Sequence, residues 1–392
     1  MHFPARVLLV GVMTGLVAGL LSACLGGGSG PANGASVAAT SAAPTNVGST
    51  VVAQDNVDAQ SAPGPNVKDA GDTAIQWQSL PAGGTSDLAG IGGDVYVVVS
   101  PPEGASILYR LAEGNRIPSA VATIPSETVT SLTAINGKLL VAGDQSLALV
   151  DPATGSATTV ELKTPPGLES KAPVPPAIAA VAAIGTRAYI VEYDSNELQV
   201  VETSPALAVL PSILLPSTME APGLIAAIGS GRLLVSQPYT FFGDAPSTVV
   251  VDPGTGASTP LPGVALGEAA VSGGRVLSAE VGQAGIVDVT GGNARTTALF
   301  SGTVTGANDL IAESADGTVW IAPGKASALM SEDAAGHDQR YLLPVFEGVS
   351  SRGGPAIQFN PEITSMVGLS GSGVAVLGTA GTTRVGFIAG DQ

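Results

Sequence analysis

Side chains that could do chemistry are few in this 392-residue chain, and their types exclude several classes of enzyme. The chain holds one cysteine, Cys24, and two histidines, His2 and His337. A zinc site built on thiolates and imidazoles needs three or four such ligands. A cysteine–histidine catalytic pair needs a free thiol within reach of an imidazole. We therefore expect no His/Cys metal site and no Cys–His catalysis.

Other catalytic motifs are equally hard to find. No nucleophile elbow, phosphate-binding loop or dinucleotide fingerprint occurs in the structural context that such a motif requires. We predict no catalytic residues and no cofactor. Catalysis by carboxylates alone, and calcium held by scattered Asp side chains and carbonyls, leave no sequence signature, so no motif supports either of them.

The setting of Cys24 explains why a secreted chain would keep one cysteine. A short polar start with a single charge, Arg6, precedes an apolar run of fifteen residues, Val7 to Leu21. That run is shorter than the roughly 20 residues of a transmembrane helix and has the length of a signal-peptide core. It ends in Leu21-Ser22-Ala23-Cys24, with small side chains before the cysteine. One cysteine cannot form an internal disulfide.

This segment resembles the lipobox of bacterial lipoproteins. The resemblance implies that residues 1–23 are removed and that Cys24 carries a lipid, which would hold the protein to the cell membrane, or to an outer membrane if the host has one. The expected location is extracytoplasmic. The alternative is an ordinary signal peptide in which Cys24 has no role.

The charge balance restricts the partners. Fifteen basic residues stand against 32 acidic ones, for a net charge of −17, and loss of Arg6 would make the mature chain more negative still. Nucleic-acid binding needs basic surface to neutralise phosphates, so we expect no nucleic-acid partner. Electrostatic adhesion to an anionic membrane is disfavoured for the same reason.

Residues 24–72 differ in composition from the rest of the chain. They are rich in Gly, Ser, Ala and Pro and show no periodicity. Such a segment buries too little apolar surface to offset the entropy of ordering it. We predict a flexible tether with a typical reach of roughly 35–40 Å.

Repeats in residues 73–392 predict the fold. Seven units share a pattern of apolar residues, a glycine turn and a short strand, and their turn glycines are Gly93, Gly137, Gly185, Gly231, Gly274, Gly317 and Gly373. The glycines are 43 to 56 residues apart. Asn136-Gly137 and Asp316-Gly317 are typical of two-residue hairpins, whose turns need positive φ. Each unit has room for about four short strands, which is the length and strand content of a β-propeller blade.

Two further turns strengthen this interpretation. Val150-Asp-Pro-Ala-Thr-Gly155 and Val251-Asp-Pro-Gly-Thr-Gly256 resemble the turn between the third and fourth strands of bacterial YVTN and quinoprotein-like (WD40-like) propellers. The last repeat supplies only three strands, and a strand at residues 74–80 precedes the first repeat. We predict an all-β, seven-bladed propeller over 73–392 whose last blade is completed by that N-terminal strand. Two stacked β-sandwiches are the alternative.

Three segments are candidates for binding, because propellers use the loops between second and third strands and the connections between blades. The first is an aromatic loop with Tyr239, Phe241, Phe242 and Asp244. The second is an acidic loop with Glu192, Tyr193 and Asp194. The third is the long insertion 341–361, which contains Arg352 in a chain that has few basic residues. Each segment also has an interpretation without function. The aromatic residues could cover the end of a blade, the acidic loop could simply be solvated, and the insertion could be an exposed loop tip.

The predicted function follows from these elements. We expect a lipid-anchored, non-catalytic platform whose propeller binds a protein or a cell-envelope glycan. The alternative is an extracytoplasmic propeller enzyme resembling lactonases, lyases or quinoprotein dehydrogenases. A shortage of histidine and of basic groups for an anionic cofactor disfavours that alternative.

Overall fold

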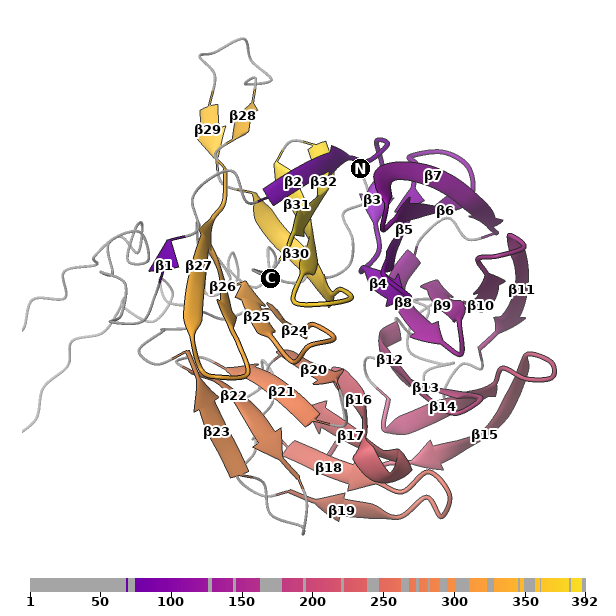
Figure 1. Cartoon of the computed structure of the whole chain (residues 1–392). Coiled ribbons are helices and arrows are strands. Elements are labelled where there is room, and N and C mark those ends of the chain that lie inside the picture. Colours follow the sequence, from indigo (N-terminus) through magenta and orange to yellow (C-terminus); the bar gives the residue numbers. More distant parts are fainter. Residues whose placement is uncertain are drawn as a thin grey trace, which may run out of the picture. The chain divides into compact units, whose positions relative to one another are not determined.

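The chain is all-β in a computed structural model, and its strands form seven blades around a ring (Figure 1). The structure describes residues 68–69, 75–125, 129–143, 146–162, 178–192, 195–219, 222–237, 247–261, 268–272, 275–280, 283–289, 295–300, 310–322, 328–344, 346–348, 357–359, 361–380 and 382–389. The predicted leader and nearly all of the predicted tether lie outside these residues. Within the described part of the chain, no helix has the length and apolar character needed to cross a membrane.

Blades follow one another along the chain, and each is an antiparallel sheet ordered from its innermost to its outermost strand. Blade 1 consists of β4 (Ala89–Ile91), β5 (Asp94–Ser100), β6 (Ser106–Ala112) and β7 (Asn115–Ile124). Blade 2 consists of β8 (Val129–Ile135), β9 (Lys138–Gly143), β10 (Ser146–Asp151) and β11 (Ser156–Glu161). Blade 3 consists of β12 (Ile178–Ile184), β13 (Arg187–Glu192), β14 (Glu197–Glu202) and β15 (Ala208–Leu214).

Blades 4 to 6 repeat the same order. Blade 4 consists of β16 (Leu224–Ile228), β17 (Arg232–Gln237), β18 (Ser247–Val251) and β19 (Ser258–Pro260). Blade 5 consists of β20 (Glu268–Ser272), β21 (Arg275–Glu280), β22 (Gln283–Asp288) and β23 (Arg295–Leu299). Blade 6 consists of β24 (Leu310–Glu313), β25 (Val319–Ala322), β26 (Ala328–Glu332) and β27 (Asp338–Leu342). The innermost strands of successive blades contact each other around the ring.

Blade 7 closes the ring as the sequence predicts. Its chain-terminal strands are β30 (Glu362–Gly368), β31 (Val374–Ala380) and β32 (Thr382–Ile388), and its fourth strand is β2 (Ile75–Ser79) from the other end of the domain. β2 pairs antiparallel with β32, from Ile75 opposite Ile388 to Ser79 opposite Arg384. This mixed blade confirms the predicted closure, and the seven-bladed ring excludes the two-sandwich alternative.

Two glycines make room for the closing strand. A Cβ placed on Gly386 would lie 2.9 Å from Ile75 Cγ2, and one placed on Gly378 would lie 3.0 Å from Trp77 Cη2. Cβ atoms essentially never approach other heavy atoms that closely, so the side chains of β2 fit because these two positions of blade 7 have none.

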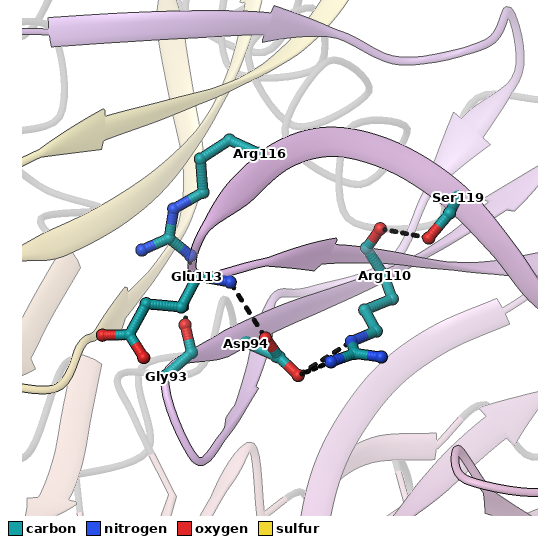
Figure 2. Close-up of polar contacts among 6 residues, drawn as sticks. All are labelled: Gly93, Asp94, Arg110, Glu113, Arg116 and Ser119. Atoms are coloured by element: carbon teal, nitrogen blue, oxygen red, sulfur yellow. Dashed lines mark hydrogen bonds and ion pairs between the residues drawn. The ribbon is translucent and has the colours of Figure 1, made fainter.

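A polar cluster of blade 1 contacts blade 7, and we call it the closure seam. Figure 2 shows its blade 1 residues. The Asp94 carboxylate accepts hydrogen bonds from Arg110 Nε at 2.8 Å and from the backbone N of Glu113 at 2.9 Å. Arg116 Nη1 donates to Gly93 O at 3.0 Å, and its guanidinium lies 4.4 Å from the ring centroid of Phe387 in blade 7. Ser370, also in blade 7, donates to Glu113.

The described part of the chain contains four short strands in addition to those of the seven blades. β3 (Gly84–Thr85) pairs with β5, and β1 (Lys68–Asp69) pairs parallel with β27 at the outer edge of blade 6. Within the 341–361 insertion, β28 (Phe346–Gly348) and β29 (Ile357–Phe359) form a separate two-stranded hairpin that stands away from the blades in Figure 1. Tyr341 belongs to blade 6 and not to a loop, because it lies in β27 and is buried against Trp320.

Of the seven predicted turn glycines, Gly274 lies outside the described residues, and the turns at the other six show two differences from the prediction. Gly93, Gly137, Gly185, Gly231 and Gly317 have positive φ. Asn136 at +47° and Gly137 at +73° give the two consecutive positive φ values of the predicted hairpin turn. Asp316-Gly317 forms a longer turn in which only Gly317 is positive, with Ser314 accepting from Gly317 N and donating to Thr318 O. In blade 7, Gly371 and not Gly373 has the positive φ.

The two Asp-Pro turns are alike and lie between third and fourth strands, as predicted. In blade 4, Asp252 Oδ1 accepts from Gly254 N at 2.8 Å, and Asp252 O accepts from Gly256 N. The hydrogen bond from Gly254 N to the carboxylate lowers the pKa of Asp252. Asp151 and Gly155 make the same contacts in blade 2.

Apolar residues fill the space between neighbouring blades. On β13, Ala188 and Ile190 pack against blade 2, while Tyr189 and Val191 pack against blade 4. Alternation along a strand places Glu192 on the side of Ala188 and Ile190, at the junction with blade 2.

Candidate binding site at the loop end of blades 3 and 4

Each blade has two ends. The hairpins between first and second strands lie at one end, together with the third-to-fourth turns, and the second-to-third loops lie at the other, which we call the loop end. Of the candidate residues, the structure describes Glu192 alone, at the loop end of blade 3. The others, Tyr193, Asp194, Tyr239, Phe241, Phe242, Asp244 and Arg352, lie outside the described residues. The strands on either side of their loops are described and define the base of the site.

Glu192 is the last residue of β13, and its side chain is 1% exposed. Gln199 Nε2, on the neighbouring strand β14, donates to Glu192 Oε1 over 2.8 Å. The second oxygen, Oε2, is buried and has no hydrogen-bond partner among the residues that the structure describes. Buried polar atoms nearly always have partners, so this unmatched oxygen distinguishes Glu192 from Asp94, whose two carboxylate oxygens both accept hydrogen bonds.

Burial controls the protonation of this carboxyl. Loss of hydration, with a further contribution from the nearby charge of Glu197, raises the pKa of Glu192 to about 7, although the hydrogen bond from Gln199 acts to lower it. The group therefore changes charge near neutral pH, unlike an ordinary exposed glutamate.

Strand pairing stops early beneath this carboxyl. The ladder between β13 and β14 ends at Ile190 opposite Gln199, although β13 continues to Glu192 and β14 begins at Glu197. In blade 4 the corresponding ladder continues to Gln237 opposite Ser247, the last and first residues of their strands. The loop end of blade 3 is therefore less closed by backbone pairing than that of blade 4.

A second buried polar group lies at the base of the aromatic loop. Ser236 and Thr248 hydroxyls are 3.0 Å apart, and both residues are buried. Ser247 Oγ is buried and has no hydrogen-bond partner within the described residues. Gln237, also buried, completes the set. These side chains hold together the two strands from which residues 238–246 emerge.

The positions recur in three consecutive blades, which is a signal that the loop-by-loop interpretation of the sequence missed. Glu192, Gln237 and Glu280 each end the second strand of their blade, five residues after an arginine that begins it. Aligning the second strands of blades 3 to 5 would have singled out these positions. Gln199, Ser236 and Thr248 could not be found in that way, because their contacts depend on pairing between strands.

The one histidine among the described residues is at the opposite end of the blades. His337 follows β26 in the third-to-fourth turn of blade 6, is largely exposed, and its Nδ1 lies 2.8 Å from Asp333 Oδ2. Nearby, Asp338 is buried with Oδ1 lacking a partner in the described part of the chain, and burial and Glu332 raise its pKa to about 6. Within the described residues, no group of three or more His, Cys, Asp or Glu could hold a metal ion.

Comparison with known proteins shows the fold class. No protein-family model matches the chain, and no curated protein matches it in sequence. Solved structures do match. A streptogramin B lyase is similar over 80% of this chain and 97% of its own, at 14% identity and a TM-score of 0.59. The WD40 domain of Neurospora crassa Pan2 is similar over 84% of this chain and 99% of its own, at 9% identity and a TM-score of 0.55.

A third similar structure is YCF48 bound to D1 peptide. It covers 83% of this chain and 100% of its own, at 14% identity and a TM-score of 0.54. Identities this low show the shared fold only. The chain is a seven-bladed β-propeller with structural neighbours among both lyases and WD40 proteins.

Proposed function

We propose that this protein is a lipid-anchored, extracytoplasmic propeller that works as a non-catalytic binding platform, and that the loop end of blades 3 and 4 contacts a protein partner. The observation that supports it most is the construction of that end. Two loops of adjacent blades leave strand ends where Glu192–Gln199 and Ser236–Thr248 are buried and hydrogen-bonded. Loops carried on a rigid scaffold are where proteins usually place binding residues.

The choice of a protein partner rests on the aromatic loop. Tyr239, Phe241 and Phe242 fall within four residues of each other, and aromatic side chains dominate the energy of protein interfaces. Among the structural neighbours, YCF48 was solved with a peptide bound, so the fold is compatible with such a role. An envelope glycan is the other ligand class expected for the same face.

The lipid anchor is tested through Cys24. In the full-length protein expressed with its leader, Cys24→Ser should move the protein from the detergent-rich to the aqueous phase in a detergent partition experiment. Metabolic labelling with a fatty-acid analogue should fail on the variant. An unchanged partition would remove the anchor from the proposal and leave the platform to be judged separately.

The platform is tested by capture of partners from detergent-solubilised membranes. Changing Tyr239, Phe241 and Phe242 together to Ala should abolish recovery of the partner. The matched control changes Ile117 and Leu214 to Ala, because these are large exposed apolar residues of the outer strands β7 and β15. Equal recovery of the same proteins by wild type and the triple variant would overturn the proposed contact surface.

One observation favours the alternative, a lyase- or lactonase-like enzyme. A carboxyl with a pKa near 7 is well suited to general acid–base catalysis at neutral pH, and Glu192 has that pKa. The test is cleavage of lactone and ester substrates by the full mature protein and by Glu192→Gln. Turnover by wild type that the variant loses would establish the enzyme, whereas the platform proposal expects no turnover by either protein.

A further inference from the structure

Glu192, at 1% exposed, combines burial with an unmatched oxygen, and the described chain has one other buried acidic residue of this kind, Asp338 at 8%. Asp94 and Glu202 lie beside arginines, with carboxylate–guanidinium distances of 2.6 and 3.2 Å. Glu192 has no ion-pair partner among the described residues; the amide of Gln199 donates a hydrogen bond to it, and the charge of Glu197 acts on it. An ionised carboxylate in that setting is costly unless a cation meets it.

The neighbouring acid strengthens the demand for positive charge. Glu197 begins β14 and accepts a hydrogen bond from Ser212 Oγ at 2.8 Å, and its charge acts on Glu192. The interrupted ladder between β13 and β14 leaves Glu192 on one strand and Glu197 on the other beyond their last backbone pair. A strongly acidic protein also draws cations toward such a point.

We infer that the strand ends of blade 3 form a receptor for a cationic side chain, with Glu192 Oε2 accepting from the ammonium of a lysine or the guanidinium of an arginine on the protein partner. This inference rests on the proposed platform function and names the chemistry of its partner. Glu192 supplies the charge, Gln199 fixes the carboxyl through Oε1, and Glu197 adds attraction from the rim. The proton that Glu192 holds in the free protein leaves to solvent when the cation binds.

The test uses the full mature lipoprotein in detergent and a tetralysine peptide as the probe. Titration calorimetry at pH 7 in two buffers of different ionisation enthalpy measures affinity and proton release together. We expect the peptide to bind and about half a proton to be released, because a group with a pKa of about 7 is about half protonated at pH 7. Tetralysine with acetylated side chains should bind more than about tenfold more weakly.

The decisive variant is Glu192→Gln, which keeps an oxygen for Gln199 and should fold. It should weaken tetralysine binding more than about tenfold and abolish proton release. Glu161→Gln is the matched control, because Glu161 lies exposed on the outer strand β11, and it should bind like wild type. Thermal unfolding checks that both variants are folded.

Three outcomes would overturn the inference: equal affinity of wild type and Glu192→Gln, binding without proton release, or preference for an uncharged oligosaccharide over tetralysine. These results are separable from failure of the platform itself. If partner capture from membranes depends on Tyr239, Phe241 and Phe242 but not on Glu192, the platform stands and the cation receptor does not.

Discussion

The closure seam and the loop end of blade 3 both hold carboxylates beside neighbouring strands, but they treat them in opposite ways. At the seam, Asp94 is partly exposed and receives hydrogen bonds from Arg110 and from the Glu113 backbone. At the loop end, Glu192 is 1% exposed and has one oxygen without a described partner. At the seam, the carboxylate is hydrogen-bonded by other residues of the ring. At the loop end of blade 3, one carboxyl oxygen has no hydrogen-bond donor among the described residues.

Physical chemistry assigns different costs to the two arrangements. Exposed ion pairs contribute between zero and about 1 kcal/mol, because water already solvates both partners. A buried carboxyl with an unmatched oxygen loses hydration without full compensation. We conclude that the ion pair of the seam adds little to stability, whereas the loop end of blade 3 gives up stability, which is common at binding sites.

The largest effect is expected where the ring closes by packing and not by charge. Gly386→Val would place side-chain atoms where Ile75 and Trp77 now lie, and should lower the free energy of unfolding by roughly 2–3 kcal/mol. Urea denaturation measures the change, and hydrogen exchange in β2 should increase. Gly114→Val is the control, since a Cβ there meets nothing within 4 Å. Equal stability of the two variants would show that β2 is not needed for closure.

The second prediction concerns pH. The pKa of Glu192 is raised from 4.5 to about 7 in the folded protein, so the folded state holds a proton that the unfolded state releases. The stability that Glu192 contributes should therefore be fully present below pH 4.5 and be lost, by on the order of 2–3 kcal/mol, as the pH rises through 7. Denaturation midpoints between pH 4 and 8 measure the slope.

Glu192→Gln should remove most of that slope above pH 6. The part that remains at lower pH belongs to Asp338, whose pKa is raised to about 6. Asp338→Asn should remove that part in turn. A slope unchanged by Glu192→Gln would contradict the burial of an ionisable group at the loop end.

A smaller effect is expected for the hydroxyl pair of blade 4. Ser236→Ala and Thr248→Val should each cost about 1 kcal/mol, and the double variant should cost less than their sum because the two hydroxyls share one hydrogen bond. A double-mutant cycle by urea denaturation measures this coupling. Strict additivity would mean that the base of the aromatic loop is not held by this contact.

The smallest effect is expected at the seam. Arg110→Met removes the charge from a side chain that is 44% exposed and should change the free energy of unfolding by no more than about 0.5 kcal/mol. Wild type and variant should also respond alike to added salt. A loss of several kcal/mol would show that the seam carries energy as well as specificity, and would weaken the contrast with blade 3.

Most of the fold could be predicted from the sequence because propeller blades are built locally. Turn glycines, Asn136-Gly137 and the two Asp-Pro turns each specify a short stretch of backbone, and their regular spacing yields the blade count. Closure by residues 75–79 could be predicted because the last repeat lacks a fourth strand and an additional strand precedes the first repeat. The shift from Gly373 to Gly371 in blade 7 was missed because three glycines in six residues offer several equivalent turns.

The candidate site was harder to predict for the same physical reason. The loop that contains Glu192 was recognised, but the burial of its carboxyl and its bond to Gln199 arise from register between β13 and β14 and from packing against blade 2. Ser236 and Thr248 look unremarkable in the sequence, since small hydroxyl residues are common in strands. Side-chain contacts between two strands that a loop connects depend on how the strands pair, so the residue pattern of either strand alone does not predict them.

The closing strand also has a mechanical consequence. If Cys24 holds the protein to a membrane as proposed, any tension on the anchor reaches the ring through β1, which lies within the predicted 24–72 tether, and then through β2, because these are the first described strands after Cys24. β1 contributes two residue pairs to β27, and β2 contributes five to β32. Once the two pairs of β1 separate, the load falls on the strand that completes blade 7, so a pull strong enough to strip β2 away would open the ring that carries the proposed binding loops.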